Sequence, residues 1–257
     1  MTLLYVNGDS HAAAAEAVVP HAWAKDDRLF WGLGRTPHPD NERASFGCEL
    51  ANLLGAVMYL DAQSGGSNPR IIRTTKEWIS NNSNILNDTF VLIQWSTWER
   101  QEWFHDSIWW QVNASGVDHV PNELQQQYKQ FVANVDWVDC TRKAHEDIWE
   151  FHCYLKDLGI QHLFFNANSH FAMPYCNANN LTVPVISKLN QKDWGTSYIS
   201  PYSAEMTYSS VLKNNGFATV SPDSYHFGAD AHCFWGKYLL NYMKQHNLLD
   251  PDEIPSY

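Results

Sequence analysis

One serine near the N-terminus has the surroundings of a nucleophile. Ser10 follows an apolar run at 3–6 and a turn-forming stretch at 7–9, and it precedes an alanine-rich run at 12–17. This order predicts a buried strand, a tight turn and a helix. The serine would then lie at a helix N-terminus, where free N–H groups and the helix dipole stabilise a developing oxyanion. The alternative is an N-cap serine without chemistry.

The partners that a nucleophilic serine needs occur near the other end of the chain. Asp223 and His226 precede a stretch with the apolar periodicity of a helix, about 231–245. In a loop or a first helical turn, their spacing lets the carboxylate reach the imidazole Nδ1 and leaves Nε2 free to face a serine. We therefore predict that Ser10, His226 and Asp223 form one hydrogen-bonded array, which favours the nucleophile over the N-cap.

The order of these two blocks resembles the SGNH (GDSL-type) hydrolase superfamily. Its Gly-Asp-Ser block corresponds to residues 8–10, and its Asp-x-x-His block corresponds to residues 223–226. The resemblance implies hydrolysis of an ester through an acyl-enzyme. Ser10 would attack the carbonyl and donate its N–H to the oxyanion, His226 would transfer the proton, and Asp223 would hold the imidazole tautomer.

Two further blocks of the family contribute to its oxyanion hole. The glycine of the second block corresponds to Gly65 or Gly66, in the loop after the second expected strand. The third block departs from the family pattern, because Gln-Trp-Ser-Thr at 94–97 replaces Gly-x-Asn-Asp. Ser96 falls on the asparagine, so its hydroxyl is the expected donor, and Gln94 is the next candidate.

Short apolar runs alternate with helix-like stretches along the chain. We expect strands at 3–7, 57–61, 89–95 and 160–166, and helices at 11–19, 44–56, 68–80, 121–158 and 231–245. This alternation predicts one three-layer α/β/α domain over residues 1–257, with a mostly parallel, flavodoxin-like sheet. Ligands bind such sheets at the carboxyl ends of the strands. The turn that contains Ser10 (the serine turn), the loop that contains Gly65 and Gly66 (the glycine loop) and the stretch at 94–96 should therefore gather at one edge. Irregular stretches at 20–43 and 167–204 are expected to be loops.

The composition narrows the classes of partner. A net charge of −11 argues against nucleic acid and anionic membrane surfaces. No apolar stretch is long enough to cross a bilayer, and no signal-peptide pattern is visible, so we expect a cytoplasmic protein without a membrane partner. The five cysteines include no Cys-x-x-Cys pair, which is typical of free thiols. The sequence leaves the oligomeric state open.

No cofactor or metal ion is expected. An acyl-enzyme mechanism needs neither, since a serine and its base supply the chemistry. Among the twelve histidines, His145 and His152 would share a helix face, but they lack the His-Glu-x-x-His spacing of a zinc peptidase.

Aromatic residues make up 14% of the chain and are dense at 95–110. Trp95 and Trp98 are candidates for stacking on sugar rings, and the alternative is a packed loop or a subunit contact. Asn166 and Asn168 follow the fourth expected strand and are candidates for hydrogen bonds to substrate. We therefore expect a small-molecule or glycan ester as substrate, an O-acetylated glycan first and a short-chain lipid or other acyl ester second.

A different class of function also fits the sequence. A relative that kept the fold and lost efficient chemistry would bind glycans or take part in an assembly. The altered third block at 94–97 favours this alternative, because it removes the family's asparagine donor.

Overall fold

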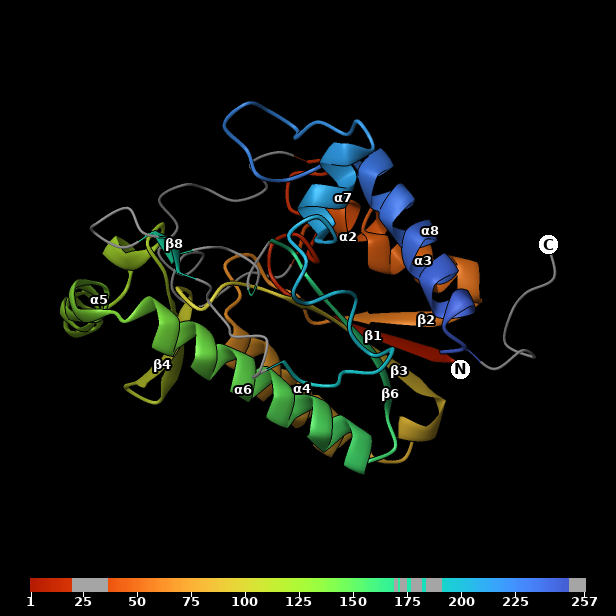
Figure 1. Ribbon diagram of the computed structural model, residues 1–257, viewed down its shortest axis with the longest axis horizontal. Helices are drawn as coiled ribbons and strands as arrows, with labels where there is room; N and C mark the ends of the chain where they lie inside the picture. The colour runs from red at the N-terminus through yellow and green to blue at the C-terminus, as the bar shows by residue number, and fades with distance from the viewer. Residues whose placement is uncertain (20–36, 169–170, 172–174, 177–181, 184–190, 250–257) are drawn as a thin grey trace.

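A parallel sheet forms the middle of the molecule in the computed structural model (Figure 1). The structure describes residues 1–19, 37–168, 171, 175–176, 182–183 and 191–249. The strands of the sheet, in spatial order, are β2 (Val57–Leu60), β1 (Leu3–Asn7), β3 (Thr89–Trp95) and β6 (Gln161–Asn166), and all neighbours are parallel. Strand β3 is buried along its whole length, as its uninterrupted apolar run requires. The four expected strands are confirmed.

A short segment continues the sheet beside β6. The Phe164 N–H donates to the Ser197 carbonyl at 2.8 Å, and the Ile199 N–H donates to the Phe164 carbonyl at 2.8 Å. Tyr198 thereby forms a parallel bridge with Phe164. The resulting order, β2-β1-β3-β6 followed by this segment, is that of a flavodoxin-like sheet.

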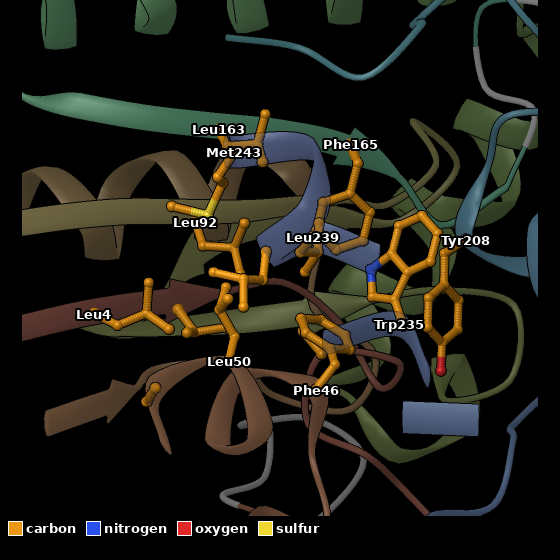
Figure 2. Close-up of a cluster of buried hydrophobic side chains, with 14 of the residues drawn as sticks. Leu4, Phe46, Leu50, Leu92, Leu163, Phe165, Tyr208, Trp235, Leu239 and Met243 are labelled. Atoms are coloured by element: carbon orange, nitrogen blue, oxygen red, sulfur yellow. The ribbon is translucent and has the colours of Figure 1, made fainter. Parts of the chain in front are cut away.

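Three helices cover one face of the sheet: α3 (Phe46–Leu54), α7 (Tyr208–Asn214) and α8 (Ala229–Gln245). Figure 2 shows the cluster beneath them, in which Leu4, Leu92, Leu163 and Phe165 come from strands and Phe46, Leu50, Tyr208, Trp235, Leu239 and Met243 come from helices. Burying each such side chain contributes about 1.5–3 kcal/mol. The cluster therefore holds α8, and the segment before it that carries His226, against the sheet.

Two longer helices, α4 (Asn68–Asn81) and α6 (Trp137–Asp157), cover the opposite face (Figure 1). A second cluster lies between them and the sheet, with members such as Ile71 and Ile148 from the helices and Val91 and Phe164 from the strands. Helices thus flank the parallel sheet on both sides, and the three-layer α/β/α class is confirmed.

The helix expected at 11–19 does not form. The chain makes successive turns there, with hydrogen bonds from the Ala13 N–H to Asp9 and from the Ala15 N–H to Ser10. Ala14 and Glu16 then take positive φ angles of 49° and 64°. A right-handed helix cannot continue through left-handed residues, so the alanine-rich composition is overridden.

One other expected helix is divided in the structure, and one helix forms in a stretch that was expected to be a loop. The stretch at 121–158 forms α5 (Asn122–Asn134) and α6, because Val135 is extended and the Asp136 carboxylate caps α6 by accepting the Asp139 N–H at 2.9 Å. That helix is α2 (Pro39–Arg43), at the end of the stretch expected to be a loop, and it precedes α3, whose N-cap is Ser45. The expected loop at 20–43 otherwise falls mainly on residues outside the described part of the chain.

An antiparallel hairpin that the sequence did not predict follows β3. It consists of β4 (Gln101–His105) and β5 (Ile108–Val112), and positive φ angles at Asp106 and Ser107 fit a two-residue hairpin turn. The remaining elements are η1 (Leu86–Asp88), η2 (Val117–His119), β7 (Tyr175–Cys176) and β8 (Thr182–Val183). In the part of the chain that the structure describes, no helix has the length and apolarity needed to cross a membrane.

Candidate active site

The loops after β1, β2 and β3 are joined by hydrogen bonds at one edge of the sheet. The Gln94 Oε1 accepts the N–H groups of Asp9 and Ala12, each at 3.2 Å. The Gln63 N–H donates to the Gly8 carbonyl at 3.3 Å. The serine turn is therefore held by the end of β3 on one side and by the glycine loop on the other.

The start of α4 completes this connection. The Asn68 Nδ2 donates to the Ser96 carbonyl at 3.1 Å, and the Ser96 N–H donates to the Asn68 Oδ1 at 2.9 Å. The Ser67 hydroxyl caps α4 by accepting the Arg70 N–H at 3.3 Å. The serine turn, the glycine loop and the stretch at 94–96 thus gather at one edge, as their positions after parallel strands indicate.

The serine turn contains a buried ion pair. Ser10 is only 5% exposed, and its neighbour Asp9 pairs with Arg100 at 2.7 Å between Oδ2 and Nη1. The Asp9 Oδ1 also accepts the His11 N–H at 2.9 Å. Burial opposes ionisation of Asp9, but Arg100 and His11 outweigh it and hold the pKa of this carboxyl below its usual range. A charged Asp9 therefore fixes the turn that carries Ser10.

The glycine loop touches the serine turn through backbone atoms. The Gly66 N–H donates to the Gln63 carbonyl at 2.9 Å, and Gly65 has a φ of 80°, which only glycine adopts readily. A Cβ on Gly66 would lie 2.8 Å from the Gly8 carbonyl oxygen, so this position requires glycine. Because the Gly66 N–H is used within the turn, the Gly65 N–H is the better candidate for an oxyanion donor.

Of the two side chains expected to replace the family's asparagine, Gln94 is engaged elsewhere and Ser96 is not. The Gln94 Oε1 holds the serine turn, and its Nε2 donates to the Trp95 carbonyl at 2.8 Å. Ser96 is buried, and its hydroxyl has no hydrogen-bond partner among the described residues, although it is close enough to Asp9 to help lower the pKa of that carboxyl. The Ser96 hydroxyl is therefore not committed to another group.

The side-chain amide of Asn113 lies beside the glycine loop. Asn113, directly after β5, places its Nδ2 3.3 Å from where a Cβ on Gly65 would lie. Its Oδ1 accepts the Gly116 N–H at 3.0 Å, which fixes the orientation of the amide. The Gln111 Nε2 donates to the Gln63 Oε1 at 3.2 Å and joins the end of β5 to the loop. The β4–β5 hairpin thus brings a side-chain N–H donor beside Gly65.

His226 pairs with Glu16 rather than with Asp223. Its Nδ1 lies 2.8 Å from the Glu16 Oε2, and both side chains are partly buried. The Ser224 hydroxyl donates to the same Oε2 at 2.6 Å and accepts the His226 N–H at 3.0 Å. A carboxylate on Nδ1 fixes the imidazole orientation and makes Nε2 the free nitrogen.

A tight hairpin explains why Asp223 does not reach His226. The Val220 N–H donates to the His226 carbonyl at 2.9 Å, and Thr219 pairs with Phe227 in an antiparallel bridge. Asp223 is therefore at the exposed tip of the hairpin. The spacing of three residues spans this tip instead of a helical turn, so the predicted contact of Asp223 with Nδ1 is not formed.

Ser10 and His226 belong to loops that contact each other through His11. The centroids of the His11 and His226 rings lie 5.4 Å apart in an edge-on arrangement. Desolvation lowers the pKa of the buried His11 to about 4, so this ring is neutral at neutral pH. No hydrogen bond joins Ser10 to His226, both of which are described residues. Catalytic hydrogen bonds often tighten only when a substrate is bound.

The expected sugar-stacking tryptophans pack inside the molecule. Trp95 is fully buried and meets Phe151 and Phe164 edge-on. Trp98 is buried against Trp137, with ring centroids 4.8 Å apart. The alternative of a packed segment therefore describes both residues.

The two asparagines after β6 have partners within the chain. The Asn166 Oδ1 accepts the Tyr198 hydroxyl, and its Nδ2 donates to the Pro201 carbonyl at 3.2 Å. Asn168 is exposed, and its Oδ1 accepts the Ser209 hydroxyl at 3.0 Å. Asn166 thus connects β6 to the following loop, while Asn168 keeps a solvent-facing position.

Sequence reasoning missed Glu16, Arg100 and Asn113 as parts of the site. Glu16 is the one acidic residue within the alanine-rich stretch, and this was the signal available for it. Arg100 directly precedes the β4–β5 hairpin and Asn113 directly follows it. The sequence pattern did not predict this hairpin, so the approach of Arg100 to the serine turn and of Asn113 to the glycine loop could not be inferred. Within the described ranges, no group of three or more His, Cys, Asp or Glu side chains is arranged to hold a metal ion.

Comparisons with known proteins concern the fold. No protein-family profile and no curated protein matches the sequence. A solved structure from Desulfitobacterium hafniense DCB-2, described as a lipolytic protein of the G-D-S-L family, shares 12% identity at a TM-score of 0.34 over 94% of this chain and 99% of its own. An acetyl xylan esterase from the rumen bacterium Butyrivibrio proteoclasticus shares 12% identity at a TM-score of 0.46 over 96% of this chain, which spans 65% of that protein. At this identity no activity is carried over.

Proposed function

We propose that the chain is a serine ester hydrolase that works through an acyl-enzyme. Ser10 would attack the ester carbonyl, and His226 would take the serine proton and return it to the leaving alcohol. The observation that carries this proposal is the carboxylate 2.8 Å from the His226 Nδ1, on the loop that also holds Ser10. It leaves Nε2 as the basic nitrogen at the carboxyl edge of a parallel sheet.

The oxyanion of the tetrahedral intermediate would be stabilised by N–H groups at the same edge. The N–H groups of Ser10 and Gly65 are the backbone candidates, and the Asn113 Nδ2 beside Gly65 is the side-chain candidate. Ser96 remains the candidate that the sequence indicates, and its buried hydroxyl has no hydrogen-bond partner among the described residues. Asn113 would replace the family's asparagine from a different element.

The substrate class that fits the surface is a short acyl ester on a glycan. On the β4–β5 hairpin, Phe104 is 60% exposed and Trp109 is 42% exposed, and their ring centroids lie 5.1 Å apart. Strand β5 continues from Trp109 to Gln111, which contacts the glycine loop. An aromatic platform on this strand would stack on a sugar ring while an attached acetyl group enters the site.

Chemical labelling tests the nucleophile. A fluorophosphonate probe should label the wild-type protein, and 4-nitrophenyl acetate should be hydrolysed. Ser10→Ala should abolish both, whereas Ser203→Ala, which removes a hydroxyl from an exposed pair with Glu205, should abolish neither. Wild-type turnover in Ser10→Ala would contradict the mechanism.

A non-catalytic glycan-binding protein is the second candidate, and the missing hydrogen bond between Ser10 and His226 favours it. It predicts that the wild-type protein does not react with the probe but binds acetylated xylo-oligosaccharides. In either case Trp109→Ala should weaken binding of the oligosaccharide. For an esterase, kcat/KM should then fall more for an acetylated oligosaccharide than for the aryl acetate.

A further inference from the structure

We propose that Glu16 is the positioning residue that orients His226 for catalysis, in place of Asp223. The role as a positioning residue in ester hydrolysis rests on the proposed function, whereas the pairing of Glu16 with His226 can be tested without any substrate.

The contacts around the imidazole support a built arrangement rather than a chance encounter. The Glu16 Oε2 faces Nδ1 at 2.8 Å and also accepts the Ser224 hydroxyl at 2.6 Å. The Ser224 hydroxyl in turn accepts the backbone N–H of His226 at 3.0 Å. The ring and the backbone of His226 are thus both linked to one carboxylate, which restricts rotation of the imidazole.

The backbone that presents Glu16 is in a conformation that L-residues rarely adopt. Ala14 and Glu16 have φ angles of 49° and 64° within three residues. A regular helix through this alanine-rich stretch would have avoided both conformations. Non-glycine residues persist in such conformations only when the surrounding contacts determine them, and they cluster at functional sites. The contacts of Glu16 with Ser224 and His226 are contacts of this kind.

The charges near His226 leave Glu16 as its acidic partner. The ionisable groups near it are Glu16 and His11 from the loop after β1 and His232 from α8, while Asp223 and Asp230 lie on its own segment. Desolvation lowers the pKa of His11 to about 4 and that of His232 to about 3, so both are neutral at neutral pH. The two aspartates are exposed. An imidazolium formed during acyl transfer would be stabilised by the carboxylate in contact with it.

The kinetic test compares Glu16→Gln with Asp223→Asn in the full chain. With 4-nitrophenyl acetate, Glu16→Gln should lower kcat about 10²-fold or more with little change in KM, because the carboxylate acts on the transition state. Glu16→Asp should recover part of this loss. Asp223→Asn should change kcat by less than about threefold, as should Asp106→Asn, a matched loss of an exposed carboxylate on the β4–β5 turn. A larger loss in Asp223→Asn than in Glu16→Gln would overturn the proposal.

An NMR measurement at a single pH reads the same contact without turnover. The ring signals of His226 are assigned by their disappearance in His226→Gln. A hydrogen bond from the His226 Nδ1–H to a carboxylate holds the proton on Nδ1 and moves its signal downfield. This signal should be lost in Glu16→Ala and kept in Asp223→Asn. Its retention in Glu16→Ala would show the proposal to be wrong, whereas its loss in a protein that hydrolyses no ester would contradict the proposed function alone.

Discussion

The Nη1 of Arg100 lies 2.7 Å from the Oδ2 of Asp9 and joins the loop after β3 to the serine turn. The Arg100 side chain is 29% exposed, whereas that of Asp9 is 2% exposed. Arg100→Met would therefore leave a buried carboxylate unpaired. We expect the free energy of unfolding, measured by urea denaturation at pH 7, to fall by about 3 kcal/mol.

Two further variants serve as controls for this ion pair. Asp9→Asn in the Arg100→Met background should recover part of the loss, because it removes the unpaired charge and keeps an acceptor for the His11 N–H. Arg142→Met, which breaks an exposed pair with Asp139, should leave the midpoint of denaturation in place. If Arg100→Met and Arg142→Met lowered the free energy of unfolding equally, the buried pair of Asp9 and Arg100 would contribute no more to stability than an exposed pair.

A second prediction decides which side chain completes the oxyanion hole. Asn113→Ala should lower kcat about 10²–10³-fold with little change in KM, because an oxyanion contact forms mainly in the transition state. Ser96→Ala should have a smaller effect on kcat. Asn134→Ala, at the exposed end of α5, is the matched control. A large fall in kcat in Ser96→Ala alone would show that the Ser96 hydroxyl, and not Asn113, is the side-chain donor of the oxyanion hole.

A third prediction concerns the contact between the glycine loop and the serine turn. A Cβ on Gly66 would lie 2.8 Å from the Gly8 carbonyl oxygen and 3.0 Å from the Gln63 carbonyl oxygen. Both are backbone atoms, so relieving the clash requires a shift of the main chain. Gly66→Ala should lower the free energy of unfolding by about 1–3 kcal/mol. Gly228→Ala, where the nearest atom belongs to a side chain, should cost less. The two unfolding curves, measured side by side, give the comparison.

A fourth prediction follows from the buried His232. Its Nδ1 accepts the Phe46 N–H at 3.3 Å, and desolvation lowers its pKa to about 3. Between about pH 6.5, the usual histidine pKa, and pH 3, the unfolded state binds the proton and the folded state does not. Stability should therefore fall on acidification through this window, by about 1.4 kcal/mol per pH unit from this group once the pH is well below 6.5.

The variant His232→Gln isolates that contribution. Glutamine keeps a hydrogen-bond acceptor but does not titrate. Urea denaturation at pH 4, 5, 6 and 7 should give a shallower decline for His232→Gln than for the wild-type protein. Parallel declines in the two proteins would mean that His232 is protonated equally in the folded and unfolded states.

The sheet was predictable because its strands are short apolar runs with distinct ends. Strand β3 has seven buried residues in succession, a pattern that a central parallel strand requires. The break between α5 and α6 was not predictable, since Val135 interrupts a continuous helical periodicity only through its extended backbone. The hairpin was missed because tryptophans and charged residues in β4 and β5 hide the alternation of a strand.

The site shows the same division between local and long-range information. Ser10 and His226 were proposed from the strand and turn before Ser10 and from the helix after His226. The partner of His226 was not, because the choice between Asp223 and Glu16 depends on a hairpin at 219–227 and on two left-handed residues in the loop after β1. Neither feature has a signature in composition or spacing.

The contact between Glu16 and His226 joins residues 210 positions apart in the chain. In the described part of the chain, each strand after β1 and every helix except α8 lies between these two residues, so the contact closes a loop that contains most of the fold. Contacts of such long range form late, since their entropic cost is met only when the intervening elements are in place. During refolding, helical circular dichroism should therefore return before this pair does, and the edge of the sheet that carries Ser10 becomes complete only in the last step of folding.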